Sequence, residues 1–133
     1  MPILLDTNVA IHFRDLDPTI FQRVIALHAL PAISVVTRVE LEGGVLRDPR
    51  TGPRRRLLLD RMLSTIATLP FTDAEASRYG RIVAAVGYSR ARTLDRMIAA
   101  QAIEAGATLI TINGQDFRDI PGLTLEVWLH PPT

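Results

Sequence analysis

The 133-residue sequence contains no cysteine and no lysine, and each absence excludes a kind of chemistry. Without cysteine, the chain cannot form a disulfide bond, a thiolate zinc site or a cysteine nucleophile. All 15 basic residues are arginine, which leaves a net charge of only +1 against 14 acidic residues. A P-loop requires a lysine that contacts the nucleotide phosphates, so the sequence excludes nucleotide binding of that type.

Aromatic residues and long apolar runs are also scarce. Only 5% of the residues are aromatic, which leaves few platforms for stacking RNA bases. No run of eighteen apolar residues occurs, and the first six residues show no basic segment or cleavage site of a secretory signal. We therefore expect a cytoplasmic protein with no membrane association. The length and the 47% hydrophobic content predict one domain over residues 1–133 with a substantial core.

Apolar segments alternate between the lengths of short buried strands and those of amphipathic helices. Strands are expected at residues 3–5, 32–36, 108–112 and 123–127, and helices at residues 7–14, 18–30, 37–44, 54–69, 73–86 and 94–105. Asp17 followed by Pro18 is typical of a helix start, and Thr72 with Glu75 forms a capping-box pattern. This alternation predicts a three-layer α/β/α fold with a mainly parallel central sheet.

Four acidic residues stand where strands give way to turns or helices. Asp6 and Asp116 follow predicted strands, Glu40 lies one turn into the segment after a strand, and Asp95 lies at the start of a helix. In a parallel sheet, strand ends and the adjacent helix starts share one edge, where ligands bind. Carboxylates that converge there repel one another and need a cation. Since their ligand atoms would all be oxygen and no histidine recurs at zinc spacing, the pattern indicates Mg²⁺ or Mn²⁺.

Each acid also has an ordinary structural explanation. Thr37 and Glu40 match a capping box, and Asp95 would interact favourably with the dipole of its helix. Asp6 and Asp116 are common residue types for turns that bond to their own backbone. These local roles are independent of one another, whereas one shared site accounts for all four positions.

Five segments that contain or flank these acids occur in a characteristic order: residues 4–9, 37–45, 95–102, 109–117 and 120–123. Together they resemble the PIN-domain proteins, and specifically the VapC-type toxins of bacterial toxin–antitoxin pairs. The resemblance extends over essentially the whole chain. It implies a PIN-like fold and a metal-dependent endoribonuclease that hydrolyses RNA phosphodiester bonds.

The same resemblance implies roles for individual residues and partners. Asp6, Glu40, Asp95 and Asp116 would be the catalytic and metal-binding residues, with Mg²⁺ or Mn²⁺ as cofactor. Thr7 and Asn113 would support the site by hydrogen bonding. A VapB-type antitoxin would cover the site, and the protein would form a homodimer through helical faces. A stripe on the second helix is a candidate for such a face or for plain core: Ile20, Phe21, Val24 and Ile25.

Arginines near the third acid favour RNA as the substrate. Arg90, Arg92 and Arg96 flank Asp95, and the segment 87–94 is more basic than the corresponding loop of the family. Arginine forks suit phosphate contacts, which position a strand without reading its bases. A second arginine cluster at residues 47–56 is typical either of a solvated surface or of a phosphate-binding one.

Other functions remain open at this point. A PIN nuclease could act in housekeeping RNA maturation instead of as a toxin, or a PIN-like domain could only bind a partner without catalysis. A haloacid dehalogenase-type phosphatase or a phospho-accepting receiver domain would also place an aspartate after the first strand. Both depend on a lysine, which this chain lacks.

Overall fold

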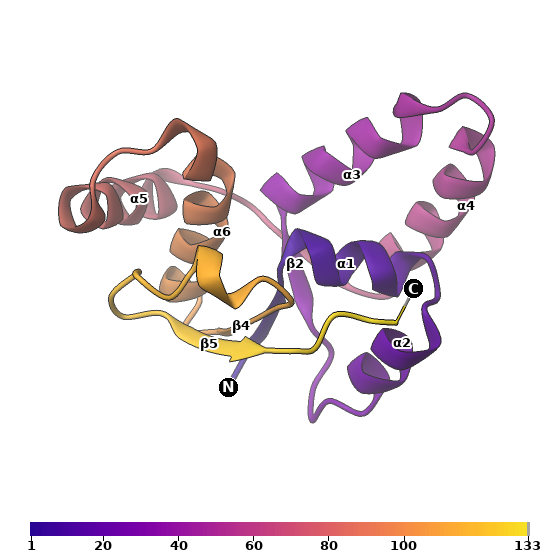
Figure 1. Cartoon of the computed structure of the whole chain (residues 1–133), viewed down its shortest axis with the longest axis horizontal. Coiled ribbons are helices and arrows are strands. Elements are labelled where there is room, and N and C mark those ends of the chain that lie inside the picture. The colour runs from indigo at the N-terminus through magenta and orange to yellow at the C-terminus, as the bar shows by residue number, and fades with distance from the viewer. Residues whose placement is uncertain (133) are drawn as a thin grey trace.

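Five short strands form the centre of the computed structural model, which describes residues 1–132 (Figure 1). All of the pairings are parallel, in the order β3-β2-β1-β4-β5. Along the chain the elements are β1 (Ile3–Leu5), α1 (Thr7–Arg14), α2 (Pro18–Ile25), β2 (Ala32–Ser34), α3 (Val35–Arg47), α4 (Gly52–Leu63), β3 (Ala67–Leu69), α5 (Asp73–Val86), η1 (Arg90–Arg92), α6 (Thr93–Glu104), β4 (Thr108–Thr111), η2 (Gly114–Asp116) and β5 (Thr124–Val127).

The central strand is buried on both faces, because its side chains alternate between two separate apolar clusters. Ile3 and Leu5 of β1 pack with residues of α1, α2 and α4, whereas Leu4 packs with residues of α5 and α6. The neighbouring strand β4 alternates in the same way, with Ile110 in the first cluster and Leu109 in the second.

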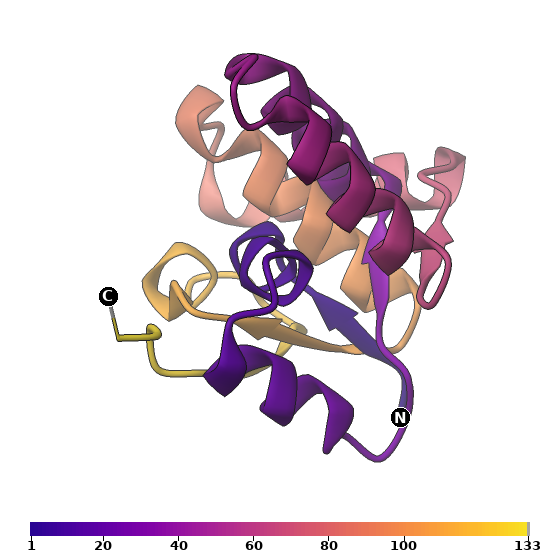
Figure 2. The same cartoon turned by 90° about the vertical axis from the view of Figure 1, so that its right-hand side faces the viewer.

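The helices therefore cover both faces of the sheet. Helices α1, α2 and α4 lie on one side and α5 and α6 on the other, as two perpendicular views show (Figures 1 and 2). The predicted three-layer α/β/α fold is confirmed, and the described pairings are parallel throughout. Among residues 1–132, no helix has the length and apolar character needed to span a membrane.

Helix α3 begins earlier and ends later than the sequence indicates. The Ser34 hydroxyl accepts a hydrogen bond from the Val36 N–H (3.0 Å), which places the helix start at Val35. The capping box predicted at Thr37 and Glu40 is therefore wrong, because both residues lie inside the helix. The expected stop at residues 43–44 is also wrong, since α3 continues to Arg47 despite its two glycines.

A short strand replaces the end of the helix predicted at residues 54–69. Helix α4 ends at Leu63, where the Thr65 hydroxyl donates to the Met62 carbonyl (2.8 Å). Strand β3 then pairs with β2 and forms an edge of the sheet. A strand of three residues is too short to show an alternating pattern, so this correction depends on tertiary pairing. By contrast, the capping box predicted at Thr72 and Glu75 is present.

Candidate active site

All four predicted acids lie at the carboxyl edge of the sheet. Asp6 follows β1 and caps α1, while Glu40 lies in the second turn of α3. Asp95 is in the first turn of α6, and Asp116 ends the short helix η2 after β4. Strands β1 and β4 are adjacent and in register, so the segments that follow them emerge side by side. The acids are close enough for their charges to act on one another, as the pKa values of two of them show.

Burial raises the pKa of Asp6 to about 6 from an ordinary value of 3.8. Its carboxylate accepts hydrogen bonds from the Thr111 hydroxyl (2.7 Å) and the Thr7 N–H (2.8 Å), and both bonds lower the pKa. The negative charges of Asp95 and Glu40 raise it further. Asp6 is therefore a buried carboxylate whose ionised form is stabilised by neutral donors only.

The pKa of Asp95 is also raised to about 6, again chiefly by burial. Repulsion from Asp116 and Glu40 adds to the effect, while Arg92 and Arg96 oppose it. No hydrogen bond contributes to this shift within the described part of the chain. A raised pKa in two acids at the same sheet edge is typical of functional sites, where a cation would stabilise the ionised forms.

Hydroxyl groups orient Glu40. The Thr7 hydroxyl donates to one carboxylate oxygen of Glu40 (2.7 Å), and the hydroxyls of Thr7 and Thr37 lie 3.0 Å apart. Thr7 thus links the start of α1 to Glu40 of α3. Thr37 is fully buried beside it and joins α3 to α1 at the point where both helices reach the site.

Asp116 forms an ion pair with Arg92, in which Nη1 lies 3.2 Å from Oδ1. Its short helix packs closely against β5, since a Cβ at Gly114 would lie 2.6 Å from the Val127 side chain. Asn113, which the resemblance implied as a supporting residue, makes a hydrogen bond through its backbone. Its N–H donates to the Thr111 hydroxyl (3.0 Å), and its own side chain is exposed.

Thr111 and Asn8 are two contributors that sequence reasoning did not identify. The Thr111 hydroxyl donates to Asp6 and accepts from Asn113, and so it connects the strand ends that carry the first and fourth acids. The Asn8 side-chain oxygen accepts from the Ile112 N–H (3.3 Å). The available signal for Thr111 was its position: a polar residue at the end of an apolar strand, level with Asp6 on the neighbouring strand.

The three arginines predicted to bind RNA differ in exposure. Arg90 is exposed and Arg92 is 39% exposed, whereas Arg96 is only 5% exposed. The Arg96 guanidinium donates to the Gly87 carbonyl and lies 3.8 Å from Asp119. Because Arg96 is buried and bonded to Gly87, it supports the α5–α6 loop. Arg90 and Arg92 are accessible from solvent.

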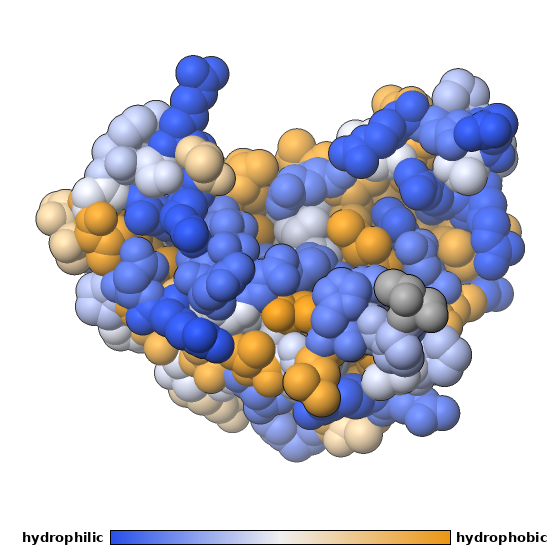
Figure 3. Space-filling model, viewed as in Figure 1, coloured by the Kyte–Doolittle hydropathy of each residue, from blue (hydrophilic) through white to orange (hydrophobic). Residues whose placement is uncertain are grey.

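The second arginine cluster is partly engaged within the protein. Arg56 pairs with Glu42 and Asp60, while Arg55 donates to the Gly44 carbonyl (3.1 Å). The contacts with Glu42 and Gly44 join α4 to α3, and these two consecutive helices form a helical hairpin on one side of the site. In the space-filling view the surface is hollowed between this hairpin and the α5–α6 side, and both rims are largely hydrophilic (Figure 3).

The donor atoms fit a hard divalent cation, although the side chains are not yet arranged around one. Four carboxylates from separate segments supply only oxygen, which matches Mg²⁺ or Mn²⁺ better than zinc. Within residues 1–132, no group of three or more acidic or histidine side chains is close enough to hold an ion. Two of the four acids have other partners, since Glu40 accepts a hydrogen bond from Thr7 and Asp116 pairs with Arg92.

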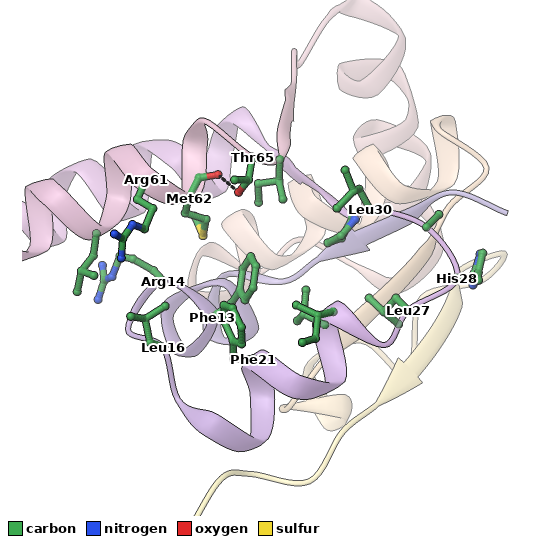
Figure 4. Close-up of a pocket in the computed structure, with 16 residues that line it drawn as sticks. Phe13, Arg14, Leu16, Phe21, Leu27, His28, Leu30, Arg61, Met62 and Thr65 are labelled. Atoms are coloured by element: carbon green, nitrogen blue, oxygen red, sulfur yellow. Dashed lines mark hydrogen bonds between the residues drawn. The ribbon is translucent and has the colours of Figure 1, made fainter.

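A separate cavity of about 580 Å³ lies between α1, α2 and α4 (Figure 4). Its walls are mainly apolar and include Phe13, Phe21 and Ile25, with Arg14 and Arg61 near Leu16 at one end. The predicted apolar stripe of α2 is divided here. Ile20 and Val24 belong to the core, whereas Phe21 and the 64% exposed Ile25 do not; Phe21, Val24 and Ile25 line the cavity.

Comparisons with known proteins find similar proteins over nearly the whole chain. The chain is 29% identical to Ribonuclease VapC2 of Rickettsia felis, over 96% of this chain and 98% of that protein. The structure of VapBC2 from Rickettsia felis bound to a promoter DNA fragment superposes with a TM-score of 0.84, at 27% identity over 96% of this chain and 99% of that one. The DNA-bound VapBC of Salmonella typhimurium gives a TM-score of 0.83 at 27% identity, over 96% and 98% of the two chains.

The family assignment follows from a match over most of the sequence. Residues 3–123 match the model of the PIN domain, and this range contains all four acids at the sheet edge. The chain therefore belongs to the PIN-domain family.

Proposed function

We propose that this protein is a metal-dependent endoribonuclease that hydrolyses RNA phosphodiester bonds. The observation that carries the proposal is the placement of Asp6, Glu40, Asp95 and Asp116 at one edge of the sheet, where burial and the repulsion between these acids raise the pKa values of Asp6 and Asp95 to about 6. PIN-domain nucleases generally depend on divalent metal ions, and a relative of this chain is named a ribonuclease.

We assign the metal site to the four carboxylates, with Mg²⁺ or Mn²⁺ as the ion. When bound, such an ion lowers the pKa of a coordinated water and stabilises charge on the attacking and leaving oxygens. Asp6 and Asp95 would be the principal ligands, because they carry the raised pKa values and Asp6 is already fixed by Thr7 and Thr111. Glu40 and Asp116 would complete the site or orient water.

The remaining polar residues would hold the site and the strand. Thr7 and the Asn113 backbone support the acids through the hydrogen bonds described above. Arg90 and Arg92 would contact RNA phosphates, since both are accessible and arginine forks match phosphate geometry. Arg96 would act indirectly by holding the loop that carries them.

The biological role we favour is the toxin of a VapBC-type pair. Relatives that match nearly the whole chain were solved as VapBC complexes, so a VapB-type antitoxin is the expected partner here. A homodimer is the expected state of the toxin itself. The antitoxin or the second toxin molecule would cover the apolar cavity between α1, α2 and α4, because large exposed apolar patches mark interaction sites.

A cleavage assay tests the enzymatic proposal. The purified protein should cut single-stranded RNA with Mg²⁺ or Mn²⁺ and lose this activity in EDTA. Asp95→Asn should lower the cleavage rate by at least about 1000-fold, because it weakens the binding of a metal ion that stabilises the transition state by several kcal/mol. Asp73→Asn is a matched control, since Asp73 is an exposed acid of α5 outside the site.

The outcomes separate the alternatives. Cleavage that persists in EDTA or in Asp95→Asn contradicts the metal assignment. Metal binding without cleavage of any RNA supports a partner-binding module instead of an enzyme. Growth arrest on expression, relieved by a small neighbouring reading frame and absent in Asp6→Ala, supports the toxin role. Cleavage without arrest favours housekeeping RNA maturation.

A further inference from the structure

The loop between α5 and α6 has a backbone that is fixed at both ends. It leaves α5 at Gly87, whose φ of 89° favours glycine, and the carbonyl of this residue accepts a hydrogen bond from the buried Arg96 guanidinium. At the other end, the Thr93 hydroxyl donates to the Ser89 carbonyl (3.2 Å), and the loop enters α6 through the helical turn η1. Arg90 and Arg92 therefore project from a backbone that is held by hydrogen bonds at both of its ends.

The side chain of Arg92, by contrast, is partly exposed and can exchange its ion-pair partner. It is 39% exposed, and its one ion pair is with the Asp116 carboxylate, itself 30% exposed. Ion pairs that are exposed to this degree are weak and are screened by salt. Arg96 differs in that its side chain is buried and its guanidinium donates to the Gly87 carbonyl.

A metal ion and Arg92 would compete for the same carboxylate. The Arg92 Nη1 lies 3.2 Å from Asp116 Oδ1, which is a distance at which a positive charge neutralises the carboxylate and repels a cation. The charge of Arg92 also acts on Asp95. In the present arrangement, Arg92 therefore weakens the attraction of two of the four acids for a divalent ion.

We propose that Arg92 is a positioning residue that exchanges partners, pairing with Asp116 in the free protein and with a phosphate of the RNA strand in the complex. A phosphate offers the guanidinium two oxygens in a geometry that matches its fork, so the exchange replaces one charge-assisted contact with another. Moving Arg92 away from Asp116 leaves this carboxylate free for the metal. Strand binding and metal binding then favour each other. The inference rests on the proposed function.

Calorimetric titration with Mn²⁺, first without nucleic acid, tests this exchange. Arg92→Gln should bind Mn²⁺ about three- to tenfold more tightly than the unmodified protein, because Asp116 is no longer paired. The control is Arg90→Gln, which removes the same charge from the same turn without a contact to Asp116 and should change affinity less than about twofold. Loss of folding would lower Mn²⁺ affinity, so tighter binding cannot come from damage.

Repeating the titration with the oligodeoxynucleotide dT15 tests the coupling. In the unmodified protein, dT15 should tighten Mn²⁺ binding, and this gain should be clearly smaller in Arg92→Gln than in Arg90→Gln. Equal effects of the two substitutions, with or without dT15, would overturn the exchange and leave only a general charge effect. If the unmodified protein binds no Mn²⁺ at all, the proposed metal site itself is refuted, and this inference with it.

Discussion

The two sides of the acidic site are built with different partners. On the side of β1 and α3, hydroxyl groups and a backbone N–H contact Asp6 and Glu40. On the side of α6 and η2, Arg92 pairs with Asp116, and the charges of Arg92 and Arg96 act on Asp95. Both pairs of acids lie at the same edge of one sheet, so the difference comes from the side chains and not from the topology.

The two kinds of partner affect a carboxylate differently: a hydroxyl group only orients it, whereas an arginine also neutralises its charge. A hydroxyl group fixes the direction of a carboxylate but leaves its charge in place, which keeps it attractive to a cation. An arginine fixes direction and cancels charge together. The hydroxyl side thus resembles a set of ligands prepared for an ion, while the arginine side is prepared to meet a second negative group such as a phosphate.

The largest expected effect is a pH-dependent loss of folding stability, which Asp6 causes on the side of β1 and α3. Raising the pKa of buried Asp6 from 3.8 to about 6 means that the folded protein holds a proton that the unfolded chain has lost. The contribution of Asp6 to the free energy of unfolding of the metal-free protein should therefore be fully present below pH 3.8 and be lost as the pH rises through about 6. At about 1.4 kcal/mol per pKa unit, Asp6 lowers stability at pH 7 by about 3 kcal/mol.

Asp6→Asn should remove most of this cost while keeping an oxygen that can cap α1. Urea unfolding in EDTA should show it to be more stable than the unmodified protein at pH 7 by up to about 3 kcal/mol, and nearly equal at pH 4. On the arginine side, Asp116→Asn loses only a half-exposed ion pair and should differ by less than about 1 kcal/mol. If both substitutions stabilise the protein equally, the two sides do not differ as described.

A second test compares the two arginines of the arginine side. Arg96→Ala leaves the Gly87 carbonyl without its charged donor and removes a packed side chain, so it should lower the free energy of unfolding by about 2 kcal/mol. Arg92→Ala should lower it by less than about 1 kcal/mol, because its pair is exposed. Urea unfolding at pH 7 measures both. A larger loss in Arg92→Ala would show that the exposed pair, and not the buried anchor, holds the loop.

The sequence allowed the acids to be located because strand ends and helix starts are defined locally. Ile3 to Leu5 and Thr108 to Thr111 are short apolar runs, and their parallel pairing places Asp6 and Asp116 at one edge whatever their exact register. The same reasoning predicted the alternation of strands and helices, and with it the three layers.

Features that depend on tertiary contacts could not be read from the sequence. Strand β3 exists because it pairs with β2, and its three residues show no period of their own. The start of α3 was misplaced because Ser34 and Thr37 are both suitable caps, and only the folded chain shows which N–H each reaches. The burial of Arg96 was likewise invisible, since its position beside Asp95 indicated surface charge.

The smallest effect concerns Thr111, which no motif indicated. Thr111→Val preserves the shape of a fully buried side chain but removes the hydroxyl that donates to Asp6 and accepts from Asn113. The lost bond to a charged acceptor should lower the free energy of unfolding at pH 7 by about 1.5 kcal/mol, and by less at pH 4, where Asp6 is protonated. Because this bond lowers the pKa of Asp6, its loss should raise that pKa further.

Metal-dependent stabilisation reports the same change independently of overall stability. The pH at which Mn²⁺ raises the melting temperature by half of its maximum should move upward in Thr111→Val, since ligand binding requires ionised Asp6. Thr108→Val is the matched control, because Thr108 lies on the same strand and contacts the Met1 sulfur instead of an acid. Its midpoint should stay unchanged. Equal midpoints in all three proteins would show that burial alone sets the acidity of Asp6 and that hydroxyl donors only orient it.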